Sequence, residues 1–299
     1  MKRIGLFMIT NFSVMLIIGI LLAIMGIKSR NLLELIALAT ITGFGGSLIS
    51  LFLSKNMALK SVGGKTIIKP SDETEQWLME TVSKQAKKMR ISMPQVAIYP
   101  AEDLNAFTTG AHHNDSLIAV SSGLLKDMKK EEVEAVLAHE MTHISNGDMV
   151  TMTLLQGIAN TFVFFISHSL NRFIYSGNRN YIPNNPFTPT IYPNYFGTVV
   201  VAILQSAVGF IATIITMWFS RKREFYADAG AAKLAGREKM IAALQRLKSS
   251  DIEPPKALTT LRPFCINGGK KNNTVTLLFK SHPSLEQRIK ALRTLKYRQ

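Results

Sequence analysis

The stretch "VLAHEMTHIS" at residues 136–145 places His139 and His143 four residues apart, with Glu140 between them. On a helix, residues i and i+4 lie one turn apart on the same face, so both imidazoles can bind one ion. The pattern His-Glu-x-x-His predicts a Zn²⁺ site in which the glutamate takes a proton from a water that the metal acidifies. With only six histidines in the chain, a chance match is rare.

A catalytic zinc usually has three protein ligands and leaves its fourth position to water, so one ligand is still needed. In "SRKREFYADAG" at 220–230, Glu224 and Asp228 have i, i+4 spacing. Glu224 would complete the zinc shell, and Asp228 would accept a hydrogen bond from a ligand imidazole. Spacing alone fits an exposed helix with two acids equally well. The other candidate ligands are His112, His113, His168, His282 and Cys265.

The composition indicates a membrane protein. Hydrophobic residues make up 47% of the 299 residues and charged residues only 18%, whereas about a quarter of an average soluble chain is charged. The net charge of +15 raises the question of a nucleic-acid partner. No run of basic residues interleaved with aromatics follows the pattern of a phosphate-binding surface, so we expect no nucleic-acid partner and a lipid bilayer instead.

Four segments are long enough to cross a bilayer, which requires about 20 helical residues, and none contains Lys, Arg, Asp or Glu. The first is too long for a signal peptide and a second follows at once, so it is interpreted as a retained anchor. The second segment contains Gly43, Gly45 and Gly46, which favour close packing against another helix. Asn31 is expected to cap the start of this second helix. The four segments are Ile4–Ile27, Leu35–Ser54, Val150–Leu170 and Gly197–Phe219.

Basic residues next to these segments predict the orientation of the chain. They precede the first segment and follow the second and fourth, which places both termini and both hydrophilic regions in the cytoplasm. The single cysteine permits no intrachain disulfide, in agreement with a reducing compartment. We therefore expect a multi-pass protein of the cell membrane. The basic residues are Lys2, Arg3, Lys55, Lys60, Lys65, Arg221, Lys222 and Arg223.

The predicted domain organisation follows from these segments. A membrane hairpin at 1–54 precedes the first part of a peptidase domain at 55–149, and a second membrane hairpin with its extracytoplasmic loop at 150–219 precedes the second part of that domain at 220–299. In the hydrophilic regions, four helices are expected: one over 71–90, one that starts near Lys129, one over 220–250 and one that starts at Pro283. Short strands are expected over 95–100, 104–110 and 116–123. The irregular stretch 251–273 is a candidate lid over the site.

Four motifs together resemble the HtpX family of membrane-bound zinc metalloproteases, relatives of the CAAX prenyl proteases and the gluzincins. They are "HEMTH" at 139–143, "NGD" at 146–148, "SRKREFYAD" at 220–228 and "SHPSLEQRI" at 281–289, and the resemblance covers almost the whole chain. It implies an α-helical integral membrane protein with a mainly helical α+β zincin (gluzincin-like) peptidase domain that contains a small β-sheet.

The resemblance also implies roles for individual residues. One zinc per chain would be held by His139, His143 and Glu224, and Glu140 would be the general base. Asp228 would accept a hydrogen bond from a ligand imidazole. In the CAAX protease relatives, an asparagine in the edge strand before the zinc helix binds the substrate backbone, and a histidine in a His-Pro motif stabilises the oxyanion. The matching residues here are Asn105 in "LNAF" and His282 in "SHPS".

The expected function is zinc-dependent hydrolysis of misfolded or damaged membrane proteins and other unfolded polypeptides, including self-cleavage. Four membrane segments are fewer than those that enclose the chamber of the prenyl proteases, so a prenylated substrate is not expected. One alternative is a non-catalytic membrane scaffold or adaptor with structural zinc, but such a site needs no base like Glu140. Another is a metal transporter, which would require metal-binding side chains inside the membrane segments, where only His168 qualifies. His112 and His113 are expected to be solvated, and Cys265 to be a packing residue.

Overall fold

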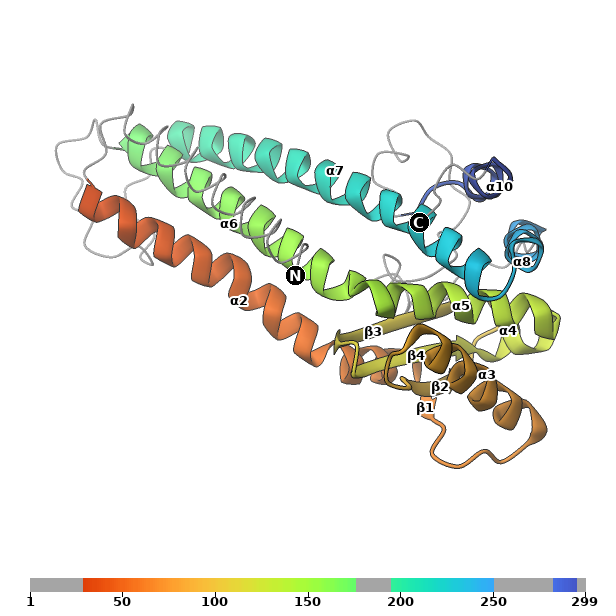
Figure 1. The fold of residues 1–299 in the computed structure, drawn as a ribbon. Coiled ribbons are helices and arrows are strands. Elements are labelled where there is room, and N and C mark those ends of the chain that lie inside the picture. The colour runs from red at the N-terminus through yellow and green to blue at the C-terminus, as the bar shows by residue number, and fades with distance from the viewer. Residues whose placement is uncertain (1–28, 176–194, 250–281, 295–299) are drawn as a thin grey trace. The chain divides into compact units, whose positions relative to one another are not determined.

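The computed structural model describes residues 29–175, 195–249 and 282–294 (Figure 1). The chain forms two compact units, and each unit is built from two separate parts of the sequence. The first unit comprises Met1–Leu48 and Thr153–Ile215, and the second comprises Ile49–Met152 and Thr216–Gln299.

Long helices make up the described part of the first unit. They belong to α2 (Ser29–Val62), α6 (Asp148–Tyr175) and α7 (Tyr195–Leu234). α2 and α6 pack closely, because a Cβ atom added to Gly43 would lie 2.5 Å from the backbone nitrogen of Thr161. Gly45 faces open space, so of the predicted packing glycines Gly43 and Gly45, Gly43 has the close contact.

Three described helices are long and apolar enough to cross a membrane: Leu33–Val62, Asp148–Ile166 and Ala202–Leu234. They overlap the second, third and fourth predicted segments. The first predicted segment, at 4–27, lies outside the described residues. The predicted cap at Asn31 is wrong, because α2 already begins at Ser29.

A four-stranded mixed sheet lies in the second unit, in the order β1-β2-β4-β3. β2 pairs with β4 in parallel, whereas β1 with β2 and β3 with β4 are antiparallel. The three predicted strands are confirmed as β2, β3 and β4, and β3 is an edge strand. The bounds are β1 Lys65–Thr66, β2 Gln95–Tyr99, β3 Ala106–His112 and β4 Asp115–Ser121.

The sheet has an apolar core on each face because successive side chains of a strand point to opposite sides. Val96, Ile118 and Val120 join one core with the helices that cover the first face, and Tyr99 and Phe107 join a second core with Ala58 near the end of α2. The helices of the first core are the end of α7 around Ala231, and α3 (Glu73–Met89), α4 (Ser122–Asp127), α5 (Lys130–Asn146), α8 (Arg237–Ser249) and α10 (Leu285–Arg293).

The helix that was expected to continue to Ser250 is divided in two. α7 ends at Leu234 and α8 starts at Arg237. Gly236 between them has a φ of +113°, a backbone conformation that glycine adopts without steric cost, and such a glycine commonly ends a helix. The expected helix over 71–90 is confirmed as α3, with the Asp72 side chain accepting a hydrogen bond of 2.7 Å from the Glu75 backbone.

Candidate active site

The helix α5 carries the His-Glu-x-x-His motif into the core of the second unit. His139, Glu140 and His143 are all buried. Gly147, with a φ of +64°, ends α5, and α6 starts at the next residue. This break lets Asp148 turn back toward the motif, so that its Oδ2 lies 2.7 Å from Nδ1 of His143.

The helix α7 approaches α5 closely through small residues. A Cβ atom on Gly230 would lie 2.4 Å from the Thr142 side chain, and Ala227 and Ala231 have no exposed surface. A larger residue at position 230 would push the two helices apart. Glu224 and Asp228 lie one turn apart on the same helix and are both buried, so this close packing brings both carboxylates to the histidines.

His139, His143 and Glu224 form a compact cluster whose potential ligand atoms all lie within 4.8 Å of one another. The two Nε2 atoms are 3.1 Å apart. Glu224 Oε2 lies 3.5 Å from Nε2 of His139, and Oε1 lies 3.4 Å from Nε2 of His143. Ligands of one tetrahedral metal at about 2.0–2.2 Å are spaced by roughly 3.3–3.6 Å, so these separations fit a single ion.

Hydrogen bonds fix how the imidazoles present their nitrogens. Nδ1 of His139 lies 3.0 Å from Asp228 Oδ1, and Nδ1 of His143 lies 2.7 Å from Asp148 Oδ2. An ionised carboxylate only accepts, so each Nδ1 donates and each neutral imidazole turns the lone pair of Nε2 toward Glu224. Two lone pairs and a carboxylate repel one another unless a cation lies between them. The donor set therefore fits a metal ion.

The electrostatics of His143 agree with this reading. Burial by itself lowers the pKa of His143, but the hydrogen bonds to Asp148 and Glu224 outweigh it and raise the pKa to about 10. The site thus favours a positive charge at this position. A metal cation supplies that charge while the imidazole stays neutral.

Glu140 lies beside the cluster without joining it. Burial raises the pKa of Glu140, although His139 and His143 act in the opposite direction. Within the described part of the chain, Oε2 of Glu140 accepts no hydrogen bond. A buried carboxylate that has a raised pKa and an oxygen without a hydrogen-bond partner is suited to act as a general base.

The other two predicted site residues, His282 and Asn105, lie at different places. His282 lies next to the cluster, with its Nδ1 2.9 Å from Glu224 Oε2. Asn105 is fully buried immediately before the edge strand β3, and α5 packs against that strand. The backbone of Asn105 is fixed by Ser121, whose N–H donates to the Asn105 carbonyl at 2.9 Å.

Two arginines and one aspartate at the site carried no individual role in the sequence interpretation. Arg288 is fully buried and forms a fork to Asp228, with Nε 2.8 Å from Oδ2 and Nη2 2.6 Å from Oδ1. Arg223 donates to the Asp148 carbonyl at 2.5 Å. Asp148 lies in the motif "NGD" and Arg288 in the motif "SHPSLEQRI". Their place in these motifs is the sequence feature that could have identified them as site residues.

Replacing Arg288 with methionine should destabilise the protein by about 3–5 kcal/mol, because it leaves the buried Asp228 carboxylate without its charged partner. Arg288→Lys keeps the charge but loses the two-pronged contact, so we expect an intermediate loss. The double variant Arg288→Met/Asp228→Leu should recover much of the stability. Thermal unfolding of the wild type, Arg288→Met, Asp228→Leu and the double variant measures this coupling, and additive effects of the two single changes would contradict it.

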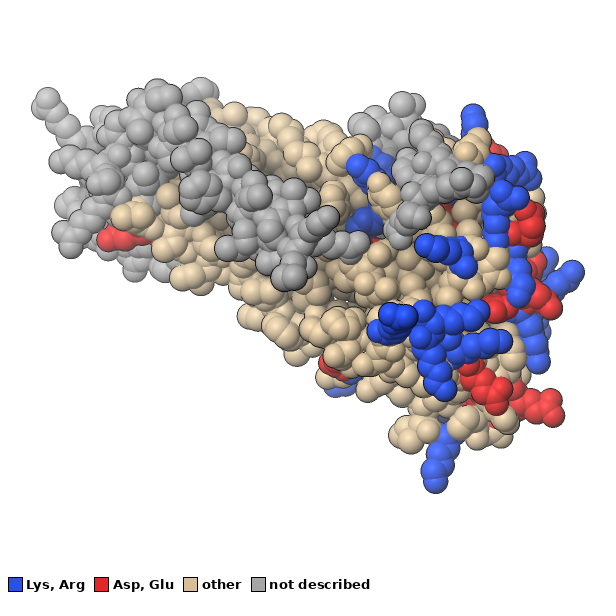
Figure 2. All heavy atoms as spheres, in the orientation of Figure 1, with Lys and Arg blue, Asp and Glu red and all other residues tan. Residues whose placement is uncertain are grey.

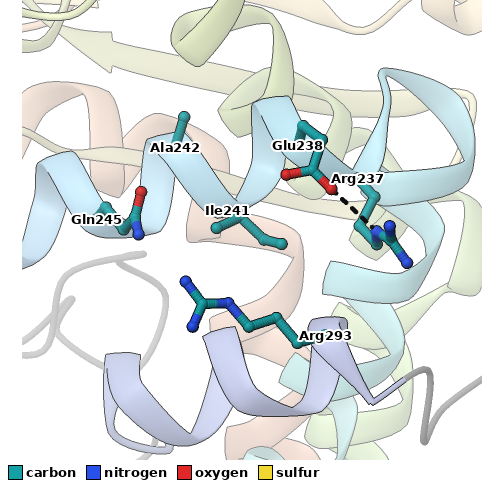
Figure 3. A pocket seen from close by; sticks show the side chains of 6 residues that line it. All are labelled: Arg237, Glu238, Ile241, Ala242, Gln245 and Arg293. Carbon is teal, nitrogen blue, oxygen red and sulfur yellow. Dashed lines mark hydrogen bonds and ion pairs between the residues drawn. The ribbon is translucent and has the colours of Figure 1, made fainter.

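Other polar features lie apart from the cluster. A hollow of about 390 Å³ between α8 and α10 is lined by Ile241, Gln245 and Arg293, among others, and by the ion pair of Arg237 with Glu238 (Figure 3). None of the predicted site residues lines it.

Of the other candidate ligands, His112 and His113 are not part of the cluster. The ring centroids of these two histidines lie 4.1 Å apart at the β3–β4 turn. Cys265 and the candidate lid lie outside the described residues. On the face that Figure 2 shows, Lys and Arg gather over the second unit, whereas the described surface of the first is mostly uncharged.

Comparison with known proteins identifies the family of the chain. The family model described as "Peptidase family M48" matches residues 72–296. The chain is 53% identical over 300 residues to "Protease HtpX" of Yersinia pestis (strain Pestoides F), and equally to that of Yersinia pseudotuberculosis (strain IP 31758), with 99% of each chain covered. The crystal structure of S. mikatae Ste24p has a similar fold, with a TM-score of 0.55 and 20% identity over 95% of this chain and 67% of that chain.

A helical fold with a small mixed sheet, membrane-length helices and a buried His-His-Glu cluster thus defines a membrane metalloprotease. The chain belongs to peptidase family M48 and, within it, to the HtpX proteases. The resemblance drawn from the four motifs is confirmed. Membership of a metallopeptidase family implies a metal cofactor.

Proposed function

We propose that the chain is a zinc endopeptidase whose single zinc is held by His139, His143 and Glu224. The observation that carries this proposal is the set of three buried ligand residues whose nearest ligand atoms lie 3.1–3.5 Å apart. The set contains two imidazoles and one carboxylate, a combination typical of catalytic zinc in peptidases that leaves one position open. The part of the chain that holds it has a zincin-like arrangement, with the motif helix packed against an edge strand.

Bound zinc supplies a Lewis acid that acidifies water and polarises a carbonyl group. Glu140 acts as the general base: its carboxylate takes a proton from the attacking water and passes it to the departing amine. Burial supports this role, because a raised pKa lets the carboxyl group hold the proton between the two transfers. Asp228 and Asp148 keep the two imidazoles oriented through Nδ1.

Two further residues would act on the substrate. The edge strand β3 has one side free of a strand partner among the described strands, and an extended peptide can bind to such an edge by main-chain hydrogen bonds. Asn105, immediately before this strand, would bind the substrate backbone. His282 lies beside Glu224 and would stabilise the oxyanion that develops on the scissile carbonyl.

The substrates are proposed to be misfolded or damaged membrane proteins, and the chain itself in self-cleavage. The ligands support this, because they lie in or next to the helices that are apolar enough to cross a membrane: Glu224 lies in α7, and α6 begins five residues after His143. The residues from 55 to 149 and from 220 to 299 would form one peptidase domain. With both termini and this domain in the cytoplasm of a multi-pass cell-membrane protein, substrate loops near the bilayer come within reach.

Metal removal tests the proposal. The detergent-purified chain, incubated with an unfolded polypeptide, should cleave it, lose at least about 95% of its activity after treatment with a zinc chelator and removal of the chelator, and recover it with one equivalent of Zn²⁺. Added Mg²⁺, which prefers oxygen ligands, should not restore cleavage. Activity that survives complete removal of zinc would contradict the proposal.

A further inference from the structure

A groove with a volume of about 340 Å³ lies between α6 and α7 in the first unit. Its α6 wall carries two amide side chains, Gln156 and Asn160. The α7 wall carries the small residues Gly209, Ala212 and Thr213. A Cβ atom at Gly209 would meet nothing within 4 Å, so this wall is open to an incoming chain.

The two amides keep hydrogen-bonding capacity that lipid cannot satisfy. Gln156 Nε2 donates to Asn160 Oδ1 at 2.8 Å, and Asn160 Nδ2 donates to Ser47 Oγ at 3.4 Å. Each amide has two N–H donors and an oxygen that can accept twice. Within the described part of the chain, Oε1 of Gln156 accepts no hydrogen bond, and both side chains are exposed. Unpaired polar groups in hydrocarbon are costly, so such residues usually mark a function.

We propose that this groove binds a transmembrane segment of a protein substrate that carries an amide or hydroxyl side chain. This inference rests on the proposed function and extends it to substrate choice. Small residues let helix backbones approach closely in a membrane, and amide side chains form hydrogen bonds between helices. Gly209 and Ala212 provide the first property and Gln156 with Asn160 the second.

The chemistry also accounts for selection of damaged proteins. In an assembled membrane protein, a polar side chain inside the bilayer is paired with a neighbouring helix. A segment that has lost its partner exposes that side chain to lipid, and the amides of the groove offer a replacement. Gln156 and Asn160 are eight and twelve residues from the start of α6, about 12 and 18 Å along the helix. The substrate's polar residue should lie at a similar depth.

The test uses two membrane-anchored substrates in proteoliposomes. Both join the same cleavable reporter to a leucine-rich span, and one span carries a single asparagine at the matching depth. We expect the wild-type chain to cleave the asparagine substrate with a kcat/KM about 5-fold higher. Gln156→Leu/Asn160→Leu should reduce this ratio to about one. Ser206→Leu, an exposed polar position on α7 outside the groove, should keep it.

A second variant guards against misfolding of the first. Gly209→Leu fills the groove from the α7 wall and removes no amide, so it should abolish the preference as well. Equal wild-type rates for the two substrates, or variants that keep the 5-fold ratio, would overturn the proposal. Co-purification of each uncleaved span with the Glu140→Gln chain gives a readout without catalysis, so failure of the proposed chemistry and failure of the groove are distinguishable.

Discussion

The Glu140→Gln variant should lose about 10²–10⁴-fold in kcat and still bind one zinc per chain. Glutamine has nearly the same shape as glutamate but does not take up a proton at neutral pH. Because Glu140 is not one of the three residues of the ligand cluster, we expect its replacement to leave His139, His143 and Glu224 in place. The comparison requires initial rates of cleavage and metal analysis on the same preparation.

Glu131→Gln is a matched control for this prediction. Glu131 is an exposed glutamate near the start of the same helix, so its replacement should change kcat by less than about 2-fold. A Glu140→Gln chain with normal activity would contradict the assignment of the base. A chain that loses activity together with its zinc would assign Glu140 to metal binding instead.

Glu224→Ala should lower zinc affinity by more than about 100-fold, and activity should disappear with the metal. Removal of a residue that only supports a ligand costs 10–100-fold, and loss of the ligand itself should exceed this. His282 and Arg288 also lose a carboxylate that lies 2.9 Å and 3.5 Å away, respectively. Competition with a chromogenic chelator measures the affinity, and circular dichroism verifies the helical fold.

Glu238→Ala is the matched control for the third ligand. Glu238 is exposed on α8, where it pairs only with its neighbour Arg237 among the described residues, so zinc affinity should stay within a factor of about two. A Glu224→Ala chain that retains tightly bound zinc would show that another residue is the third ligand.

The parts of the site that local periodicity determines could be predicted from the sequence. His139 and His143 follow the i, i+4 spacing that places side chains on one helix face, as do Glu224 and Asp228. Short apolar runs between turns predict the strands β2, β3 and β4, and apolar residues at helical spacing predict α3. In each case the signal lies within a few residues of the chain.

The parts that depend on distant contacts could not be predicted in this way. Arg288 contacts Asp228 across 60 residues, and Arg223 contacts Asp148 across 75. No local pattern reveals that a basic residue will be buried against a particular acid. The close approach of Gly230 to Thr142 is similarly invisible, because it depends on how α5 and α7 pack. The division between α7 and α8 had a local signal in Gly236, which the continuous helical pattern on both sides obscured.

X-ray absorption at the zinc edge of the metal-loaded chain tests the assignment of the zinc ligands. We expect one zinc per chain, surrounded only by nitrogen and oxygen atoms at about 2.0–2.2 Å, with the scattering of two imidazoles. Glu224→Ala should change this spectrum or abolish it. A sulfur ligand at about 2.3 Å, for which Cys265 is the sole cysteine in the sequence, or a shell without two imidazoles would contradict the assignment of His139, His143 and Glu224.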